Sequence, residues 1–225
     1  MDISTIYVVI PAFNEEKKIG EVVSSVKEIF TNVVVVNDCS RDATSCVAEK
    51  SQATVLNHFI NLGQGAALQT GIDYCKKRNA EYIVTFDADG QHSIADVKLM
   101  LDEIVKSNCD VVLGSRFLGE SIGMPKSRKL LLKLAIIYTY LTTGLKLTDA
   151  HNGIRILSRK AIEKIKIRQN RMAHASEILE QIAENKLNYC EYPVTISYSE
   201  YSLQKGQKWW DAFPIIVDSI LRKFR

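Results

Sequence analysis

Residues 82–92 have the sequence YIVTFDADGQH, in which an apolar, strand-like segment runs directly into a polar cluster. Asp87 and Asp89 are two residues apart, so at the bend from strand to loop they can flank a single cation. Mg²⁺ and Mn²⁺ prefer such carboxylate oxygens, and Gln91 can add a neutral oxygen ligand. The competing interpretation is a solvated turn whose carboxylates only cap the next helix. The position directly after an apolar strand favours a metal site formed by Asp87, Asp89 and Gln91.

Strands and helices alternate on both sides of this segment. Apolar β-branched runs predict strands at 6–10, 33–36, 54–57, 82–86 and 110–114. Apolar periodicity predicts helices near 19–29, 44–50, 66–78 and 94–105. Ser93 resembles the N-cap of the last of these helices, with Asp96 three residues further on. Continuous apolar strands separated by helices predict an α/β fold with a mainly parallel central sheet covered by helices on both faces.

Four polar clusters, PAFNEE, NDCSRD, DADGQ and GSR, follow predicted strands. Ligands bind at the carboxyl ends of the strands in such sheets, so the clusters predict one shared site. Asp38 can accept hydrogen bonds from a base or a ribose, but an Asx turn or a helix cap suits it equally. Glu15 has the same ambiguity, because acidic residues favour the first turn of a helix. The segment 61–67, NLGQGAA, is no Walker loop and predicts a glycine-permitted turn.

The second half of the chain is less regular. An apolar helix is expected at 130–143, a polar turn near 148–155 leads into a strand, and a helix at 176–186 precedes a strand at 189–197 and a tail helix. No low-complexity linker and no repeat interrupts the chain. We expect a single domain over 1–225, with a nucleotide-sugar and metal half at about 1–118. The half at about 119–225 would receive the acceptor and end in a basic amphipathic helix.

The composition limits the class of protein. The 225 residues are 46% hydrophobic and 24% charged, with a formal net charge of +3, which is too even a balance to predict nucleic acid as a partner. Five scattered cysteines without a C-x-x-C pair indicate small buried side chains in a reducing compartment. The N-terminus lacks the features of a signal peptide, and no apolar run approaches the ~18 residues of a membrane span. A cytoplasmic or peripheral membrane protein is therefore expected.

The motifs PAFNEE, NDCSRDAT, NLGQGAA, DADGQH, GSRF and DAHNGIR, in this order and spacing, resemble family 2 glycosyltransferases. The dolichyl-phosphate mannose synthase type, which transfers sugars to polyprenyl phosphates, is the most similar. This resemblance covers nearly the whole chain. It implies the GT-A fold, a nucleotide diphospho-sugar donor and inversion at the sugar carbon.

The resemblance also implies roles for individual residues. The nucleoside would contact Pro11, Phe13, Glu15, Val36 and Asp38. The metal ion, Mg²⁺ or Mn²⁺, would be held by Asp87, Asp89 and Gln91, and Ala88 would lie at the nucleotide. The phosphates would be contacted by Arg116 and Lys205. Phe13 stands where the family usually has Tyr, and Asn37 replaces a frequent Asp. The stretch SYSEYSLQ before Lys205 lacks an arginine that relatives often carry. The segment 151–155, HNGIR, departs from the usual S-G-F-R, so the acceptor side is less well defined than the donor side.

The chemistry expected of such a site is charge neutralisation. Departure of a nucleoside diphosphate develops negative charge, which a divalent ion at Asp89 and the guanidinium of Arg116 would stabilise. A lipid monophosphate acceptor, held by Arg128 and Arg155, is already ionised near pH 7 and needs no strong base. A sugar hydroxyl of a cell-surface glycan precursor would need one, and Asp149 is then the candidate. A non-catalytic nucleotide-sugar-binding protein is a third possibility, against which the intact metal motif argues.

Two segments have the composition of helices that lie on a membrane surface. The apolar helix that begins at Leu130 is flanked by the basic residues Lys126, Arg128, Lys129 and Lys133. The tail 205–225 combines Trp209 and Trp210 with aliphatic and basic residues. Packing of both helices on the sheet is the alternative. We therefore expect a membrane surface or a membrane protein as a partner, on the cytoplasmic face.

Overall fold

Seven strands and seven α-helices follow one another in the computed structural model, which describes residues 2–198. The strands are β1 (Ile6–Ala12), β2 (Asn32–Asn37), β3 (Thr54–Asn57), β4 (Tyr82–Thr85), β5 (Val111–Ile122), β6 (Arg155–Ser158) and β7 (Tyr189–Ser197). The helices are α1 (Ile19–Lys27), α2 (Thr44–Lys50), α3 (Gln64–Lys77), α4 (Ile94–Ser107), α5 (Lys126–Thr143), α6 (Arg159–Lys164) and α7 (His174–Glu184). A short 3-10 turn at Ile3–Thr5 precedes β1.

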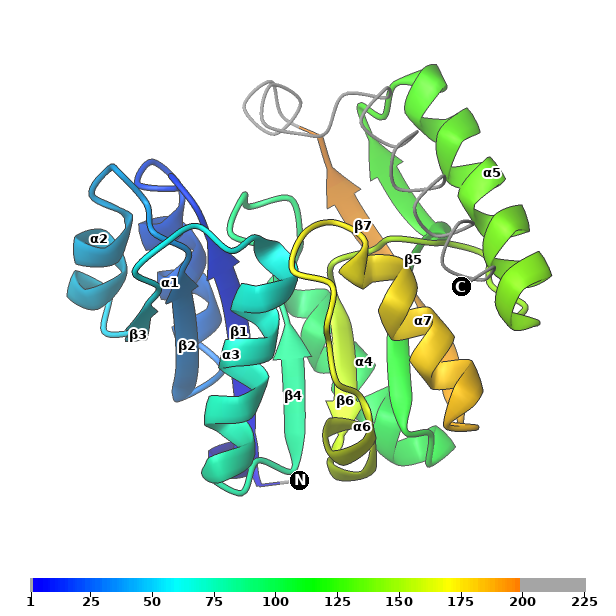
Figure 1. Ribbon diagram of the computed structural model, residues 1–225, viewed down its shortest axis with the longest axis horizontal. Coiled ribbons are helices and arrows are strands. Elements are labelled where there is room, and N and C mark those ends of the chain that lie inside the picture. Colours follow the sequence, from blue (N-terminus) through cyan, green and yellow to red (C-terminus); the bar gives the residue numbers. More distant parts are fainter. Residues whose placement is uncertain (1, 199–225) are drawn as a thin grey trace.

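The strands form one sheet in the order β3-β2-β1-β4-β6-β5-β7 (Figure 1). All neighbouring pairs are parallel except those of β6, which runs antiparallel to β4 and to β5. The prediction of a mainly parallel sheet is therefore confirmed. Reversal of β6 brings its first residue, Arg155, to the edge where β4 ends, since Thr85 pairs with Arg155.

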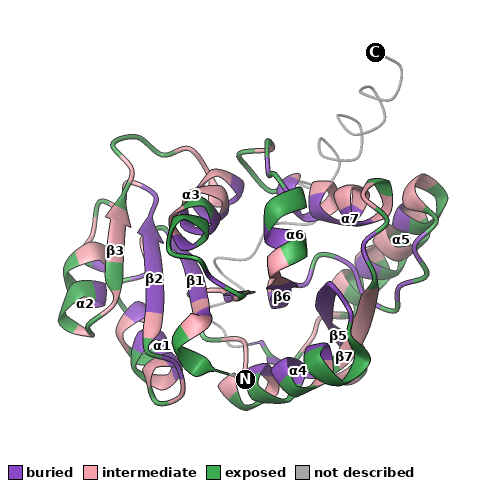
Figure 2. Ribbon diagram, turned by 90° about the horizontal axis from the view of Figure 1, so that it is seen from below, coloured by how far each residue is buried: buried purple, intermediate pink, exposed green. Residues whose placement is uncertain are grey.

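Two hydrophobic layers cover the two faces of the sheet (Figure 2). Alternate residues of β1 divide between them: Val8 and Ile10 pack with α1 and α4, while Val9 packs under α3. This alternation follows from the two-residue period of a strand, and the lack of polar positions in between is what burial on both faces requires. The helices α3, α6 and α7 form the second layer.

The strand β5 is longer than predicted. It was expected to end at Gly114, with GSR at its carboxyl end, but it continues to Ile122 and so contains Ser115 and Arg116. Its register against β7 shifts between Ser115 and Glu120. This irregularity explains why β5 is longer than predicted. The strand bulges between Ser115 and Glu120 and then pairs with β7 again as far as Ile122.

The start of α4 differs from the predicted capping arrangement. Ser93 occupies the N-cap position, but its side chain makes no capping hydrogen bond. Asp96 instead accepts a hydrogen bond from the backbone N–H of Thr195 at 2.7 Å. Thr195 lies in the edge strand β7, whose outer N–H groups need acceptors from outside the ladder. The short helix α6 was not predicted, because six residues carry too little periodicity.

The helix α5 packs against α7 at the far end of the sheet from β3 (Figures 1 and 2). Much of its surface is exposed, including Leu130, Leu134, Ile137 and Leu141. No helix within residues 2–198 is long and apolar enough to cross a membrane. The predicted tail helix, with Lys205, Trp209 and Trp210, lies outside the described residues.

Candidate functional site

The aspartates of the D-A-D motif follow β4 at the carboxyl edge of the sheet, the upper edge in Figure 1. Asp87 is held from two directions: Gln64 Nε2 donates to its Oδ1 at 3.1 Å, and His92 Nε2 lies 3.1 Å from its Oδ2. Asp89 Oδ1 accepts the backbone N–H of Gln91 at 3.0 Å. The side chain of Ala88, between them in sequence, is buried in the hydrophobic layer of α1 and α4. The two carboxylates are thus held by hydrogen bonds at a partly buried bend.

The two carboxylates influence each other electrostatically. Burial and the charge of Asp87 raise the pKa of Asp89 to about 6. Burial also acts on Asp87, but the hydrogen bond and charge of His92, with the charge of Arg155, bring the pKa of Asp87 below its usual value. Two partly buried carboxylates that disfavour each other's ionisation fit a divalent cation, which would remove the repulsion.

No cluster of three or more His, Cys, Asp or Glu side chains within residues 2–198 could surround a metal ion. A cation at Asp87 and Asp89 would therefore draw its other ligands from neutral oxygens, water and a bound diphosphate. This donor set suits Mg²⁺ or Mn²⁺, which bind through few carboxylates plus phosphate oxygens.

A second strand approaches the motif from the opposite direction. Thr85 Oγ1 donates to the backbone carbonyl of Gly153 at 2.6 Å. A Cβ atom placed on Gly153 would collide with the carboxylate of Asp87, so any larger residue would displace that carboxylate. Residues 68 positions apart in the chain thus meet at the metal motif.

Arg155 follows Gly153 and is almost completely buried. Burial lowers the pKa of its guanidinium to about 10, against the opposing effect of the negative charges of Asp87 and Asp149. His174, at the start of α7, is also buried, and its pKa falls to about 4 through burial and the charge of Arg155. His174 is therefore kept neutral beside the charge of Arg155.

Arg116 is the second buried guanidinium of the site. Its Nε donates to Asp149 Oδ2 at 2.7 Å, its Nη1 donates to the hydroxyl of Tyr198 at 2.8 Å, and its Nη2 to the carbonyl of His151 at 3.4 Å. Burial acts to lower the pKa of Arg116, but the charges of Asp149 and Tyr198 and the hydrogen bonds to these two side chains raise it above its usual value. The arginine therefore stays charged and fixed.

Asp149 is committed to this arrangement. Its Oδ2 also accepts the backbone N–H of Arg116 at 3.0 Å and the side chain of Asn152 at 3.2 Å, and its Oδ1 accepts the N–H of Ala150 at 2.8 Å. Both oxygens are occupied. The carboxylate therefore holds the guanidinium of Arg116 in place.

Arg128 reaches the site through Tyr198. Its guanidinium carbon lies 5.2 Å from the centre of the Tyr198 ring, within the range of a cation–π contact. Because the hydroxyl of the same tyrosine contacts Arg116, Tyr198 connects the first turn of α5 to the buried arginine. The fourth predicted phosphate contact, Lys205, lies outside the described residues.

Asp38 is held inside the fold by contacts with the segment that precedes α3. It is buried, and its carboxylate accepts the backbone N–H groups of Leu62 and Gly63 at 2.9 and 2.7 Å and contacts His58 Nδ1 at 2.8 Å. Asn37 makes the local turn contact instead, accepting from the N–H of Ser40. Asp38 thus ties the end of β2 to the glycine loop before α3, where Gly63 has a φ of +104°.

The remaining predicted nucleoside residues line up along the ends of β1 and β2. Phe13 is 44% exposed directly after β1, and Glu15 is buried, with its N–H bonded to Thr44 Oγ1 at 2.7 Å. Pro11 and Val36 pair across the sheet. Both are buried, and Val36 packs in the layer under α3, so its side chain supports the site from below.

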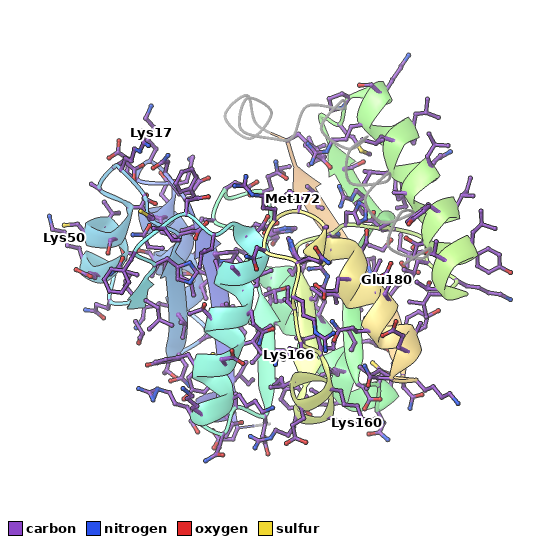
Figure 3. The ribbon with its side chains drawn as sticks, viewed as in Figure 1. Lys17, Lys50, Lys160, Lys166, Met172 and Glu180 are labelled. Carbon is purple, nitrogen blue, oxygen red and sulfur yellow. The ribbon has the colours of Figure 1, made fainter. Side chains whose placement is uncertain are left out.

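The structure adds residues to which the sequence analysis assigned no role as site residues. Gln64, His92, Gly153, His174 and Tyr198 all contact or face the charged groups of the site. Gln64 begins α3 inside the glycine-bearing segment, and a Cβ on its neighbour Gly65 would collide with the carbonyl of Gln169. Figure 3 labels Met172 at this upper edge, in the loop that lies over the start of α3. The tight packing of that loop against the start of α3 is the feature that points to these residues. It can be recognised only once the fold is known.

Comparison with known proteins agrees with this geometry. The family model described as Glycosyl transferase family 2 matches residues 7–166, well over half of the chain. A UDP-N-acetylglucosamine–dolichyl-phosphate N-acetylglucosaminyltransferase from Methanococcus voltae is 32% identical over 241 residues, covering 97% of this chain and 96% of the relative. A polyprenol monophosphomannose synthase from Mycolicibacterium smegmatis is 26% identical over 211 residues, covering 88% and 79%.

A similar fold occurs in a glucosyl-3-phosphoglycerate synthase from Mycobacterium tuberculosis, solved with Mg²⁺ and uridine diphosphate. The TM-score is 0.73 at 17% identity, over 96% of this chain and 79% of that one. At this identity the likeness shows the fold alone, which is GT-A. With a family model over most of its length and named sugar transferases among its relatives, the chain belongs to glycosyl transferase family 2 and is a glycosyltransferase of the GT-A fold.

Proposed function

We propose that this glycosyltransferase moves a sugar, with inversion, from a GDP- or UDP-sugar to a polyprenyl phosphate at the cytoplasmic face of a membrane. One observation carries the proposal: the buried guanidinium of Arg155 feels the charge of Asp87 in the D-A-D motif and also the charges of the Arg116–Asp149 pair. A carboxylate pair and an arginine pair together suit a ligand that carries both a metal-bound diphosphate and a second anionic group.

Each residue would have a defined task. Asp87, Asp89 and Gln91 would hold Mg²⁺ or Mn²⁺, which when bound neutralises charge on the leaving diphosphate. Arg116, fixed by Asp149 and Tyr198, would donate hydrogen bonds to that group without reorganising. Phe13, Pro11 and Glu15 would line the nucleoside, and Arg155 with Arg128 would face the acceptor.

The state of Asp149 favours a phosphate acceptor over a sugar hydroxyl. A hydroxyl must lose a proton, and the only carboxylate proposed for that task is occupied on both oxygens. A phosphate monoester is already ionised near pH 7, since its second pKa is about 6. The names of the relatives from Methanococcus voltae and Mycolicibacterium smegmatis support the same class of acceptor.

The acceptor experiment uses a panel of UDP- and GDP-sugars with three acceptors: a short polyprenyl phosphate, the matching alcohol, and a free sugar. Mass spectrometry and anomer analysis follow the products with Mg²⁺, with Mn²⁺ and with excess chelator. We expect an inverted product on the phosphate only, lost with chelator. Product on the free sugar alone would favour the glycan-hydroxyl alternative, and undiminished turnover with chelator would overturn the metal site.

The exposed face of α5 supports a membrane surface as the partner. Leu130, Leu134, Ile137 and Leu141 lie on it together with Lys126, Lys129 and Lys133. Aliphatic and basic side chains on one exposed helix suit an anionic bilayer surface. Co-sedimentation with phosphatidylglycerol vesicles should fall in Leu134→Glu. Val105→Glu on α4, a matched control with 54% exposure like Leu134, should bind as the wild type. Equal binding of both variants would argue against α5 as the contact.

A further inference from the structure

Cys109 and Cys190 bring their sulfur atoms together from positions 81 residues apart in the chain. The Sγ–Sγ distance is 2.7 Å. This is only about 0.7 Å longer than a disulfide bond of about 2.05 Å, and closer than a non-bonded sulfur contact. The pair could not be predicted from the sequence, because the two cysteines lie far apart in the chain.

The backbone fixes the pair in place. Cys109 stands between α4 and β5, after Asn108, which ends the helix with a φ of +51°. Cys190 is the second residue of β7 and pairs with Val112 of β5 in a parallel register. The backbone N–H groups of Asp110 and Val111 both donate to the carbonyl of Asn188, at 2.7 and 3.1 Å. The two sulfur atoms are therefore held together by the sheet itself.

The surroundings favour reaction of the pair. Ser107 Oγ lies 3.1 Å from Cys109 Sγ and 3.5 Å from Cys190 Sγ. Hydrogen bonds from the Cys190 thiol and from Ser107 lower the pKa of Cys109 to about 7, although burial opposes them. Cys190 is partly exposed on the edge strand, which gives a small reagent access. A thiolate is the nucleophile in thiol–disulfide exchange.

We propose that Cys109 and Cys190 form a reversible disulfide that clamps the edge strand β7 to the turn between α4 and β5. The oxidant is a low-molecular-weight disulfide. A thiolate of the pair attacks one of its sulfur atoms, forms a mixed disulfide and releases one thiolate. The second cysteine loses its proton, attacks the sulfur of the first and displaces the other small thiol. The protein gains one S–S bond, and the small disulfide is reduced to two thiols.

The clamp is remote from the sugar-transfer site. Asp110, next to Cys109, pairs with Lys160 at 2.8 Å, and Figure 3 labels Lys160 at the lower edge, away from the site. Tyr198 follows the opposite end of β7. The disulfide should therefore stabilise the fold without changing donor turnover. Closing a loop of this length is expected to raise Tm by roughly 5–15 °C.

The test oxidises the full-length protein with glutathione disulfide, blocks remaining thiols under native conditions and maps the peptides by mass spectrometry. We expect a Cys109–Cys190 link with loss of two hydrogen atoms, and a higher Tm that a reductant reverses. Cys190→Ser and Cys109→Ser should lose both effects, while the exposed control Cys46→Ser should keep them.

The Cys190→Ser variant and the wild-type map decide the question even if serine at the buried position 109 prevents folding. Glutathione on Cys46 with both Cys109 and Cys190 still alkylatable would overturn the proposal, since the oxidant would then have acted elsewhere. A link between two chains, or a Tm that does not respond to oxidation, would overturn it as well.

Discussion

Nε of Arg116 lies 2.7 Å from Oδ2 of Asp149, in an ion pair whose side chains are only 4% and 1% exposed. The same carboxylate oxygen accepts the backbone N–H of Arg116, so Asp149 binds both the backbone and the side chain of this residue. A buried pair of this kind is not in itself evidence of stability, but loss of one partner leaves an uncompensated charge. The ion pair instead holds the guanidinium of Arg116 in one position before a ligand binds.

Asp149→Asn should lower both stability and turnover, because Arg116 would keep its charge without a counter-ion. We expect a loss of about 3 kcal/mol in the free energy of unfolding, measured by urea titration. Glu163→Gln, which removes the exposed pair with Arg159, should change it by less than about 0.5 kcal/mol. An unchanged urea midpoint in Asp149→Asn would contradict the role given to the pair.

Gly153→Ala should impair the metal site, because the added methyl group collides with the carboxylate of Asp87. The expected effect is a roughly 10–100-fold loss of metal-dependent turnover, with a higher metal concentration needed for half activation. The control is Gly144→Ala, where the backbone has a φ of +75° but no atom lies within 4 Å of the added carbon. Gly144→Ala should lose some stability but keep the metal activation curve of the wild type. If the two variants had equal metal activation curves, the predicted collision between the added methyl group and Asp87 would be contradicted.

His92→Phe tests whether the imidazole positions Asp87. Phenylalanine can keep the packing against Phe86, whose ring centre lies 5.6 Å away, but loses the contact with Oδ2. Nδ1 of His92 is buried without a hydrogen-bond partner in residues 2–198, so the stability cost should stay within about 1 kcal/mol. Metal activation curves should shift by roughly 10-fold or more. A shift in stability without one in metal response would show a packing role only.

Asp38→Asn distinguishes a structural from a nucleoside-binding role. The amide would face the N–H groups of Leu62 and Gly63 with one acceptor fewer, which should cost about 1–3 kcal/mol in thermal unfolding. Asp73→Asn, an exposed change on α3, serves as the control. If Asp38 acts through the loop alone, the preference between UDP- and GDP-sugars should persist. A changed preference at unchanged stability would assign it to the nucleoside.

Asp89→Asn should separate stability from activity. Neutralising one of two neighbouring, partly buried carboxylates relieves their repulsion, so the metal-free protein should gain roughly 1 kcal/mol in unfolding free energy. Turnover with Mg²⁺ or Mn²⁺ should fall by at least about 100-fold. Calorimetry without metal and product assays with it measure the two effects, and retained turnover would remove Asp89 from the site.

The strands and the D-A-D motif could be predicted from the sequence because both depend on neighbouring residues. The apolar run 82–86 and the aspartates after it are adjacent, and β7 was predicted at its observed bounds. The contacts that complete the site could not be predicted. Gly153 approaches Asp87 only because β6 enters the sheet in reverse, and Arg116 was expected beyond a strand that in fact contains it. Such contacts depend on how the strands pair and on bulges within them, and neither can be predicted from the pattern of neighbouring residues.

The reversed strand β6 also sets an order of events when the chain is made. It separates β4 from β5, so the edge of β4 has no partner on that side until residues 155–158 have been synthesised. An unpaired apolar edge readily associates with other chains. The strand that leads into the D-A-D motif thus has an edge open to misassembly in the nascent protein, and the arrival of residues 153–158 both covers that edge and brings Gly153 and Arg155 to Asp87.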